Sequence, residues 1–218
     1  MTNILNTQKE PSLGNTRFIT FEGPDGCGKS TQIQLTADYL RKKGYNVIVT
    51  REPGGTELAE KIREMVLSAK NDISLETEIL LFLSARSIHV SKKIRPAINN
   101  GTIVLCDRFA DSTMVYQGIC SGITLATIGA LNAFATKGLS PDLTILLDAD
   151  PNILAVRRKE RDTTDRIEAK GNEFQRKVRN GFLELAMKYP HRIKIIDATQ
   201  TPEQVQAAIQ KLLMEKNL

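Results

Sequence analysis

A glycine-rich stretch near the start of the chain, FEGPDGCGKST (residues 21–31), carries residue types that bind phosphate. Gly23, Gly28, Lys29 and Ser30 match the spacing G-x-x-x-x-G-K-[ST] of a P-loop. The glycines allow backbone N–H groups to converge on an anion at the start of a helix, where the helix dipole favours negative charge. In such a loop the lysine reaches the β- and γ-phosphates of a nucleotide, and the serine hydroxyl faces Mg²⁺. The motif therefore predicts nucleotide binding.

The residues around this motif predict the elements that position it. Five short apolar runs end in polar residues, as buried parallel strands do, and helical stretches separate them. The runs are RFITFE (17–22), YNVIVT (45–50), TIVLCD (102–107), LTILLD (143–148) and RIKIID (192–197). The alternation predicts an α/β fold in which a five-stranded parallel sheet is flanked by helices on both faces. Ligands of such sheets bind at the carboxyl ends of the strands.

The first and last helical stretches carry recognisable ends. KSTQIQLTADYLRKKG (29–44) finishes in basic residues and a glycine, and TPEQVQAAIQKLLMEK (201–216) begins with a capping threonine followed by proline. The first of these helices follows the glycine-rich stretch directly. The motif therefore lies between a strand and a helix, which is the context that a P-loop requires.

The composition is that of an ordinary single-domain globular protein. The chain has 218 residues, of which 41% are hydrophobic and 25% charged, so it can bury a full core. We expect a flexible leader over residues 1–16 and one P-loop domain over residues 17–218. No apolar run approaches the roughly 18 residues of a membrane span, so no membrane association is expected.

Charge, cysteines and histidines add weaker constraints. The net charge of +5 is scattered along the chain and suits an anionic small substrate as well as nucleic acid. Cys27, Cys106 and Cys120 are odd in number and lack C-x-x-C spacing, which indicates neither a disulfide framework nor a zinc site. A reducing, cytoplasmic setting is the simplest interpretation. His89 and His191 show no partner pattern and are interpreted as structural.

P-loops occur in nucleotide switches, motors and kinases, and the rest of the sequence separates these classes. Switch GTPases carry a further DxxG motif after a later strand and an NKxD guanine reader, and this sequence has neither. The chain is also short for a motor domain. These observations favour a small kinase that acts on a phosphate or hydroxyl acceptor.

Three further motifs take the interpretation beyond this class. They are TREPGGT (50–56), CDRFADSTMVYQG (106–118) and RRKERDTTDRIE (157–168). Together with the P-loop, their order and spacing closely resemble the bacterial thymidylate kinases, from about Arg17 to the C-terminus. The resemblance implies ATP- and Mg²⁺-dependent phosphorylation of dTMP to dTDP. One departure is Phe109, where the family commonly has tyrosine, and this weakens any role of that hydroxyl.

The resemblance implies a thymine site on the helical stretch 74–94. Phe82 and Arg86 are four residues apart and so share one helix face. Phe82 would stack on thymine, and Arg86 would donate to a base carbonyl and reject cytosine, whose amino group is also a donor. Without the family, Phe82 would be assigned to the core and Arg86 to the surface.

The remaining acceptor residues come from several motifs. Arg108 would bind the acceptor phosphate with its forked guanidinium, Asp25 would face the acceptor sugar, and Tyr116 would crowd a ribose 2′-hydroxyl. The full implied dTMP set is Asp25, Glu52, Pro53, Arg63, Phe82, Arg86, Arg108, Thr113, Tyr116 and Gln117. Without the resemblance, two of these residues have alternative interpretations without a binding role: Asp25 as a solvated turn residue, and Arg63 as an exposed helical arginine.

The resemblance also implies the catalytic, metal and donor sites. Catalysis would depend on Lys29, Asp25, Arg108 and Arg161, with Ser30 and Asp107 facing Mg²⁺. The ATP site would comprise Gly23, Pro24, Asp25, Gly26, Cys27, Gly28, Lys29, Ser30, Thr31 and Arg157. The adenine would lie between Arg157 and the DATQ turn (197–200).

The arginine-rich motif matches a lid at about residues 157–169. Some thymidylate kinases place an arginine inside the P-loop, but the matching position here is Gly26, so the lid must supply it, as in the bacterial arrangement. Arg157 and Arg161 share a helix face. Arginines that neutralise a phosphoryl group in transfer accelerate the reaction about 10³- to 10⁵-fold. The alternative is a solvated run of charges, because acidic side chains partly neutralise the segment.

Two other functions stay open on the sequence. One is another nucleoside monophosphate or deoxynucleoside kinase, and the other is a nucleotide-sensing P-loop protein without catalysis. The presence of Lys29, Asp107, Arg108 and the lid arginines favours a kinase. The resemblance further implies a cytoplasmic homodimer whose ligands are ATP and dTMP, with no nucleic-acid partner.

Overall fold

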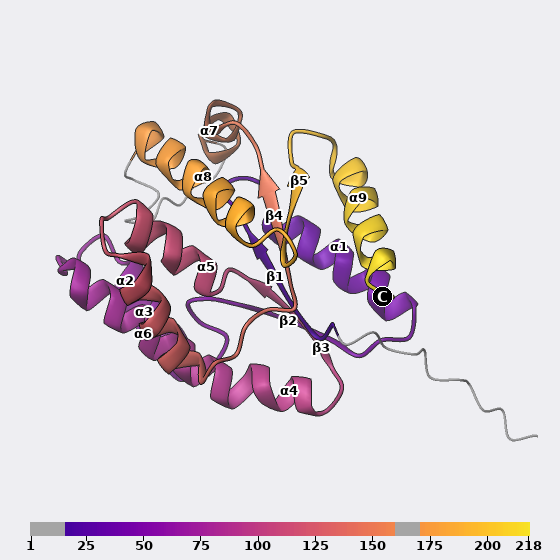
Figure 1. Cartoon of the computed structure of the whole chain (residues 1–218), viewed down its shortest axis with the longest axis horizontal. Helices are drawn as coiled ribbons and strands as arrows, with labels where there is room; N and C mark the ends of the chain where they lie inside the picture. The colour runs from indigo at the N-terminus through magenta and orange to yellow at the C-terminus, as the bar shows by residue number, and fades with distance from the viewer. Residues whose placement is uncertain (1–15, 160–170) are drawn as a thin grey trace, which may run out of the picture.

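The computed structural model describes residues 16–159 and 171–218, and a five-stranded parallel sheet lies at its centre (Figure 1). The strands are β1 (Phe18–Glu22), β2 (Val47–Arg51), β3 (Ile103–Asp107), β4 (Leu143–Asp148) and β5 (Ile193–Asp197). Their order in the sheet is β2-β3-β1-β4-β5, and every neighbouring pair is parallel. Each strand lies within two residues of its expected bounds. The prediction of an α/β fold with five parallel strands is confirmed.

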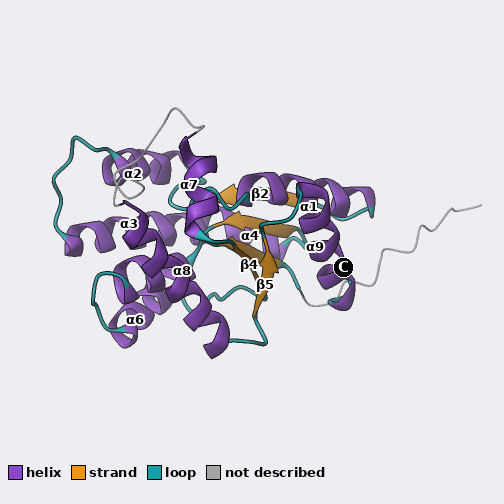
Figure 2. Ribbon diagram, turned by 90° about the horizontal axis from the view of Figure 1, so that it is seen from above, coloured by secondary structure: helices purple, strands orange, loops and turns teal. Residues whose placement is uncertain are grey.

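Helices cover both faces of the sheet (Figure 2). They are α1 (Lys29–Lys42), α2 (Glu57–Leu67), α3 (Leu75–His89), α4 (Arg95–Asn99), α5 (Ala110–Thr113), α6 (Leu125–Thr136), α7 (Pro151–Lys159), α8 (Gly171–Lys188) and α9 (Pro202–Glu215). α1 and α9 pack together on one face, whereas α4 and α8 pack on the other. α2, α3 and α6 stack side by side at one end of the molecule (Figure 1).

The pleat of β1 sorts its side chains between the two faces. Ile19 and Phe21 pack into the cluster shared with α1 and α9, whereas Phe18 packs on the opposite face against Val104. Because side chains alternate along a strand, Glu22 points to the same face as Phe18. Glu22 is the last residue of β1, and its side chain contacts the loop that follows β3.

Local signals explain the ends of α1 and the start of α9. Gly28 precedes α1 with a φ of 93°, a left-handed conformation that favours glycine. α1 ends at Lys42, just before the expected glycine, Gly44. Thr201 caps α9: its hydroxyl accepts from the Gln204 backbone N–H, and the Gln204 side chain accepts from the Thr201 N–H. The predicted threonine cap is confirmed.

Two π-helical segments follow α-helices directly, and the first lies within the helical stretch expected over 74–94. They are η1 (Val90–Ile94), which continues α3, and η2 (Met114–Ile119), which continues α5. η2 carries Tyr116 and Gln117, both of which are buried. π-helical turns occur frequently at functional sites, because the extra residue re-aims the side chains that follow.

Some expectations fall outside the described residues. The leader predicted over residues 1–16 lies there except for its last residue, and so does most of the lid predicted at about 157–169. Within the described ranges, no helix has both the length and the apolar character needed to cross a membrane.

Candidate active site

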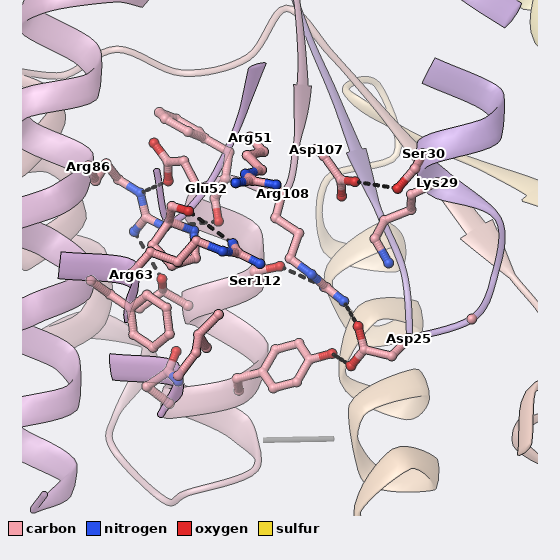
Figure 3. A pocket seen from close by; sticks show the side chains of 18 of the residues that line it. Asp25, Lys29, Ser30, Arg51, Glu52, Arg63, Arg86, Asp107, Arg108 and Ser112 are labelled. Atoms are coloured by element: carbon pink, nitrogen blue, oxygen red, sulfur yellow. Dashed lines mark hydrogen bonds and ion pairs between the residues drawn. The ribbon is translucent and has the colours of Figure 1, made fainter. Parts of the chain in front are cut away.

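The carboxyl ends of β1, β2 and β3 open into one cavity of about 270 Å³. All ten residues of the predicted dTMP set line it, together with Gly26, Gly28, Lys29, Ser30 and Asp107. Figure 3 shows Arg86 and Glu52 on one side of this cavity, Lys29 and Ser30 on the other, and Arg108 between them. The structure therefore brings residues from three of the motifs, and from α2 and α3, to one place, whereas their contacts with a nucleotide stay predictions.

The P-loop requires its glycines for steric reasons. A Cβ at Gly23 would lie 2.4 Å from the Leu147 carbonyl oxygen and 2.9 Å from Cys27 Sγ, and φ at Gly23 is +139°. Lys29 Nζ donates to the carbonyl oxygens of Gly23 and Pro24 at 3.1 Å each, so the lysine is held within the loop. Cys27 is buried beneath the loop, and burial raises the pKa of its thiol. This agrees with a packing role for Cys27.

Asp25 is paired with Arg108 rather than solvated. Arg108 Nη2 donates to Asp25 Oδ1, and the Tyr116 hydroxyl donates to Asp25 Oδ2 at 3.3 Å. Burial alone would raise the pKa of Asp25, but the charges of Arg108 and Lys29 outweigh it and hold that pKa below its ordinary value. The ionised carboxylate in the phosphate-binding loop therefore orients the arginine across the cavity.

Arg86 is buried and almost fully engaged by the protein. Its Nε donates to Glu52 Oε2 at 2.6 Å, Nη1 donates to Thr113 Oγ1 at 2.9 Å and Asn132 Oδ1 at 2.6 Å, and Nη2 donates to the Phe109 carbonyl oxygen at 3.1 Å. Its side chain is 2% exposed. The expectation of a surface arginine, drawn without the family, is wrong because α3 is enclosed by other elements on this side.

Glu52 and His89 form the support behind Arg86. Glu52 Oε1 lies 3.0 Å from His89 Nδ1, and His89 Nε2 lies 2.7 Å from Thr50 Oγ1. His89 is fully buried, and a Cβ at Gly55 would lie 2.5 Å from its ring. His89 therefore has a structural role, as expected. Its partners are Glu52 and Thr50, which no spacing in the sequence indicated. His191 is exposed.

The other predicted acceptor residues have individual contacts. Arg63 Nη1 donates to the Pro53 carbonyl oxygen at 3.0 Å and is partly buried, so it is not simply an exposed helical arginine. Phe82 is partly buried and lines the cavity, rather than lying wholly in the core. Gln117 Nε2 donates to the buried Glu78 Oε1 at 2.7 Å, which fixes the direction of the amide.

Several residues near the cavity were not predicted from the sequence. Arg51 lines it and pairs with Glu60 at 2.9 Å, and Ser112 lines it next to Arg108. Glu22 lies behind the cavity, where burial, then the charge of Asp111, raises its pKa to about 7. Arg51 directly precedes Glu52 in the TREPGGT motif, which was the available signal. Nothing in the local pattern of β1 distinguishes Glu22 from an ordinary strand end.

Ser30 and Asp107 form the oxygen pair expected to face Mg²⁺. Ser30 Oγ donates to Asp107 Oδ2 at 3.2 Å, and both residues line the cavity beside Lys29. A hydroxyl and a carboxylate are ligands that suit Mg²⁺, which keeps several waters and takes other ligands from substrate phosphates. The donor set therefore fits the metal. In the described ranges, no group of three or more His, Cys, Asp or Glu side chains could hold a metal ion by itself.

The two segments predicted to hold the adenine are in contact, whereas the adenine site itself stays a prediction. Arg157 Nη1 donates to the Ala198 carbonyl oxygen at 3.0 Å, which links α7 to the DATQ turn. Asp197 organises that turn by accepting from the Thr199 backbone and hydroxyl and from Gln200. Arg161 lies outside the described residues.

Comparisons with known proteins show which family the chain is similar to. A family model described as thymidylate kinase matches residues 21–209. The thymidylate kinase of Symbiobacterium thermophilum is 46% identical over 199 residues, covering 91% of this chain and 92% of that protein. The thymidylate kinase of Gloeobacter violaceus is 46% identical over 204 residues, covering 91% and 96%.

A solved structure supports the fold as well as the family. The crystal structure of thymidylate kinase from Ehrlichia chaffeensis matches with a TM-score of 0.74 at 37% identity, covering 91% of this chain and 98% of that chain. The expected P-loop nucleotide kinase fold is confirmed. The chain belongs to the thymidylate kinase family.

Proposed function

We propose that this protein is a dTMP kinase, which transfers the γ-phosphoryl group of ATP to dTMP and releases dTDP and ADP. The observation that carries this function is one cavity that joins phosphate-binding and base-binding groups. Lys29 and Arg108 supply positive charge near the P-loop, and Phe82 with the anchored Arg86 supplies an aromatic face and an oriented donor. A nucleoside monophosphate presents the matching groups, a phosphate at one end and a base at the other.

Arg86 is well suited to read the base. Its contacts with the protein use four of the five N–H donors of a guanidinium and hold its plane in place. The remaining Nη2 hydrogen would donate to a carbonyl oxygen of thymine. Cytosine has an amino group at the corresponding position, and two donors facing each other in a buried site disfavour binding.

Catalysis by this site requires alignment and charge neutralisation, not a general base. The acceptor is a phosphate monoester with a second pKa of about 6, so its attacking oxygen is already ionised at neutral pH. Arg108, held by Asp25, would bind the acceptor phosphate, and Lys29 would bind the donor phosphates. These two cations would hold the two repelling polyanions in line for transfer.

Mg²⁺ would be held by Ser30 and Asp107, with the ATP phosphates supplying further oxygens. When bound, the metal supplies positive charge at the β- and γ-phosphates. Ser30 lies on α1, which follows the P-loop after β1, and Asp107 ends the neighbouring strand β3, so the packing of α1 on the sheet sets their separation.

The acceptor is tested by ADP release with ATP and Mg²⁺ against a panel of dTMP, dUMP, dCMP, dGMP, AMP, UMP and thymidine. We expect the highest kcat/KM with dTMP. Preference for another acceptor would contradict the thymine assignment while leaving the P-loop mechanism intact. ATP binding without turnover on any acceptor would instead support a nucleotide sensor.

A homodimer is also part of the proposal. α2, α3 and α6 pack side by side and expose large apolar side chains, with Phe134 at 87% exposure. Leu58 and Met65 lie on the same side of α2, seven residues apart, and Leu80 is exposed on α3. Exposed apolar surface of this kind marks an interface. A second copy of the chain would cover it.

The dimer is tested by light scattering during size-exclusion chromatography. We expect the native chain to elute as a dimer and Phe134→Glu to elute as a monomer, because a carboxylate there would have to be desolvated in the interface. Met187→Glu is the matched control, since Met187 on α8 is 75% exposed and lies outside α2, α3 and α6. Equal behaviour of the two variants would contradict this interface.

The remaining parts of the proposal concern the setting of the protein. We propose a single P-loop domain over residues 17–218 that acts in the cytoplasm on ATP and dTMP and has no nucleic-acid partner. Its three cysteines are free, which suits a reducing compartment.

A further inference from the structure

We infer that Glu22, the last residue of β1, is a positioning residue that holds Arg108 in place to receive the acceptor phosphate. The inference deepens the proposed function and rests on it, since it takes Arg108 as the arginine that binds the dTMP phosphate. Glu22 itself lies behind the cavity and does not line it. It would act only through the loop that carries Arg108.

The contacts of Glu22 connect it to both the backbone and the side chain of Arg108. Glu22 Oε1 accepts from the backbone N–H of Phe109 at 2.7 Å, and Oε2 accepts from the Ser112 hydroxyl at 2.6 Å. Ser112 Oγ in turn accepts from Arg108 Nη1 at 3.1 Å (Figure 3). Both carboxylate oxygens therefore act as acceptors, one for the loop and one for the relay to the guanidinium.

The backbone of Arg108 needs such support. Its φ is +66°, a left-handed conformation that few residues other than glycine adopt. The Arg108 N–H donates to the Phe21 carbonyl oxygen at 3.0 Å, and the next N–H, that of Phe109, donates to Glu22. The end of β1 thus holds the two successive amides that define this turn. Strained backbone of this kind persists where the surroundings over-determine it.

The surroundings of Glu22 are electrostatically unfavourable for a carboxylate, so its presence at this position needs a specific reason. Glu22 is fully buried, and its neighbour Asp111 carries a like charge. Asp111 is itself engaged by Arg192, at 2.6 and 2.8 Å. The charge of Arg108 offsets that of Glu22, and Arg192 also interacts with Glu22. An apolar side chain would avoid the cost of desolvation. It could not accept from Phe109 and Ser112.

The first test is Glu22→Gln, which keeps the shape but replaces one acceptor oxygen by a donor group. We expect the dissociation constant for dTMP, measured by calorimetry, to rise about tenfold, the effect of losing one hydrogen bond in a charged network. The dissociation constant for ATP should stay within about threefold. Asp142→Asn is the matched control: Asp142 accepts the N–H groups of Arg17 and Phe18 at the other end of β1, far from the cavity. It should leave dTMP binding unchanged.

A double-mutant cycle with Arg108→Ala separates this inference from the proposed function. In the Arg108→Ala background, Glu22→Gln should weaken dTMP binding no further. An equal loss in both backgrounds, or no loss in the native background, would overturn the positioning role. If Arg108→Ala by itself left dTMP affinity unchanged, the acceptor-phosphate site would be wrong, and the positioning role would fall with it.

Ser112→Ala gives the same information if Glu22→Gln does not fold. It removes the relay between Glu22 and Arg108 without disturbing the buried carboxylate's contact with the Phe109 N–H. We expect a smaller loss of dTMP affinity, of a few fold, that disappears in the Arg108→Ala background. A loss that persists there would overturn the inference.

Discussion

Arg161→Ala is expected to lower kcat for dTMP phosphorylation by about 10³- to 10⁵-fold, the range measured when an arginine that neutralises the moving phosphoryl group is removed. The described P-loop contains no arginine, and Gly26 has a φ of +88° that side chains rarely adopt. On the proposed function, we therefore expect the lid predicted at about residues 157–169 to supply the arginine that neutralises the γ-phosphoryl group. Single-turnover kinetics would measure the loss, and nucleotide affinities should change much less.

The matched control for this prediction is Arg176→Ala. Arg176 is an exposed arginine on α8 whose Nη2 donates to Asn152 Oδ1 at 3.4 Å, and it lies outside the lid motif. We expect its kcat to stay within about twofold of the native value, because exposed surface contacts contribute little. If Arg161→Ala also kept kcat within about tenfold, the arginine-rich stretch would be a solvated run of charges and not a catalytic lid.

Arg86→Met is expected to destabilise the fold by about 3–5 kcal/mol, because it leaves the buried Glu52 carboxylate without its cation. Thr113 and Asn132 would also lose the donor that they share. For a domain of this size, such a loss corresponds to a fall in Tm of roughly 10 °C. Thermal and urea denaturation would measure it, and dTMP binding should be lost in the same variant.

A more exposed ion pair serves as the control for the buried one. Arg179 pairs with Asp148 at 2.7 and 2.8 Å, but the two side chains are 29% and 17% exposed. Arg179→Met should therefore cost about 1 kcal/mol or less. The double variant Glu52→Gln with Arg86→Met should regain part of the stability, since it removes the uncompensated charge. Similar losses for the two arginine variants would contradict the argument from burial.

Much of the fold follows from patterns within short stretches of the chain. A strand that is buried on both faces is an apolar run in the sequence, and a P-loop is a fixed spacing of glycines, lysine and serine, because both depend on backbone geometry over a few residues. Gly23 and Gly28 illustrate this: each has a positive φ in the structure, and the motif alone indicated it. The sheet, the loop and the cap at Thr201 could therefore all be predicted.

The residues of the candidate site could not be predicted from local patterns in the sequence. The membership of the dTMP set came from the resemblance to a family, since no local pattern distinguishes a base-reading arginine such as Arg86 from a surface one. The tertiary structure shows what holds the Arg86 guanidinium in place to read a base. Its partners Glu52, Thr113 and Asn132 come from three other parts of the chain. Such contacts leave no periodic signal, because each depends on where two distant segments meet.

The order of residue types along the chain is enough to predict the class of fold and the phosphate-binding loop, and to recognise the family's motifs. The side chains that support these features are known from the folded chain alone: Glu22 contacts Ser112, 90 residues away in the sequence, and Glu52 contacts Arg86, 34 residues away. The two kinds of feature depend on contacts over different distances along the sequence. Backbone conformation responds to neighbours within a few positions, whereas the position of a buried charge depends on partners that folding brings to it from far along the chain.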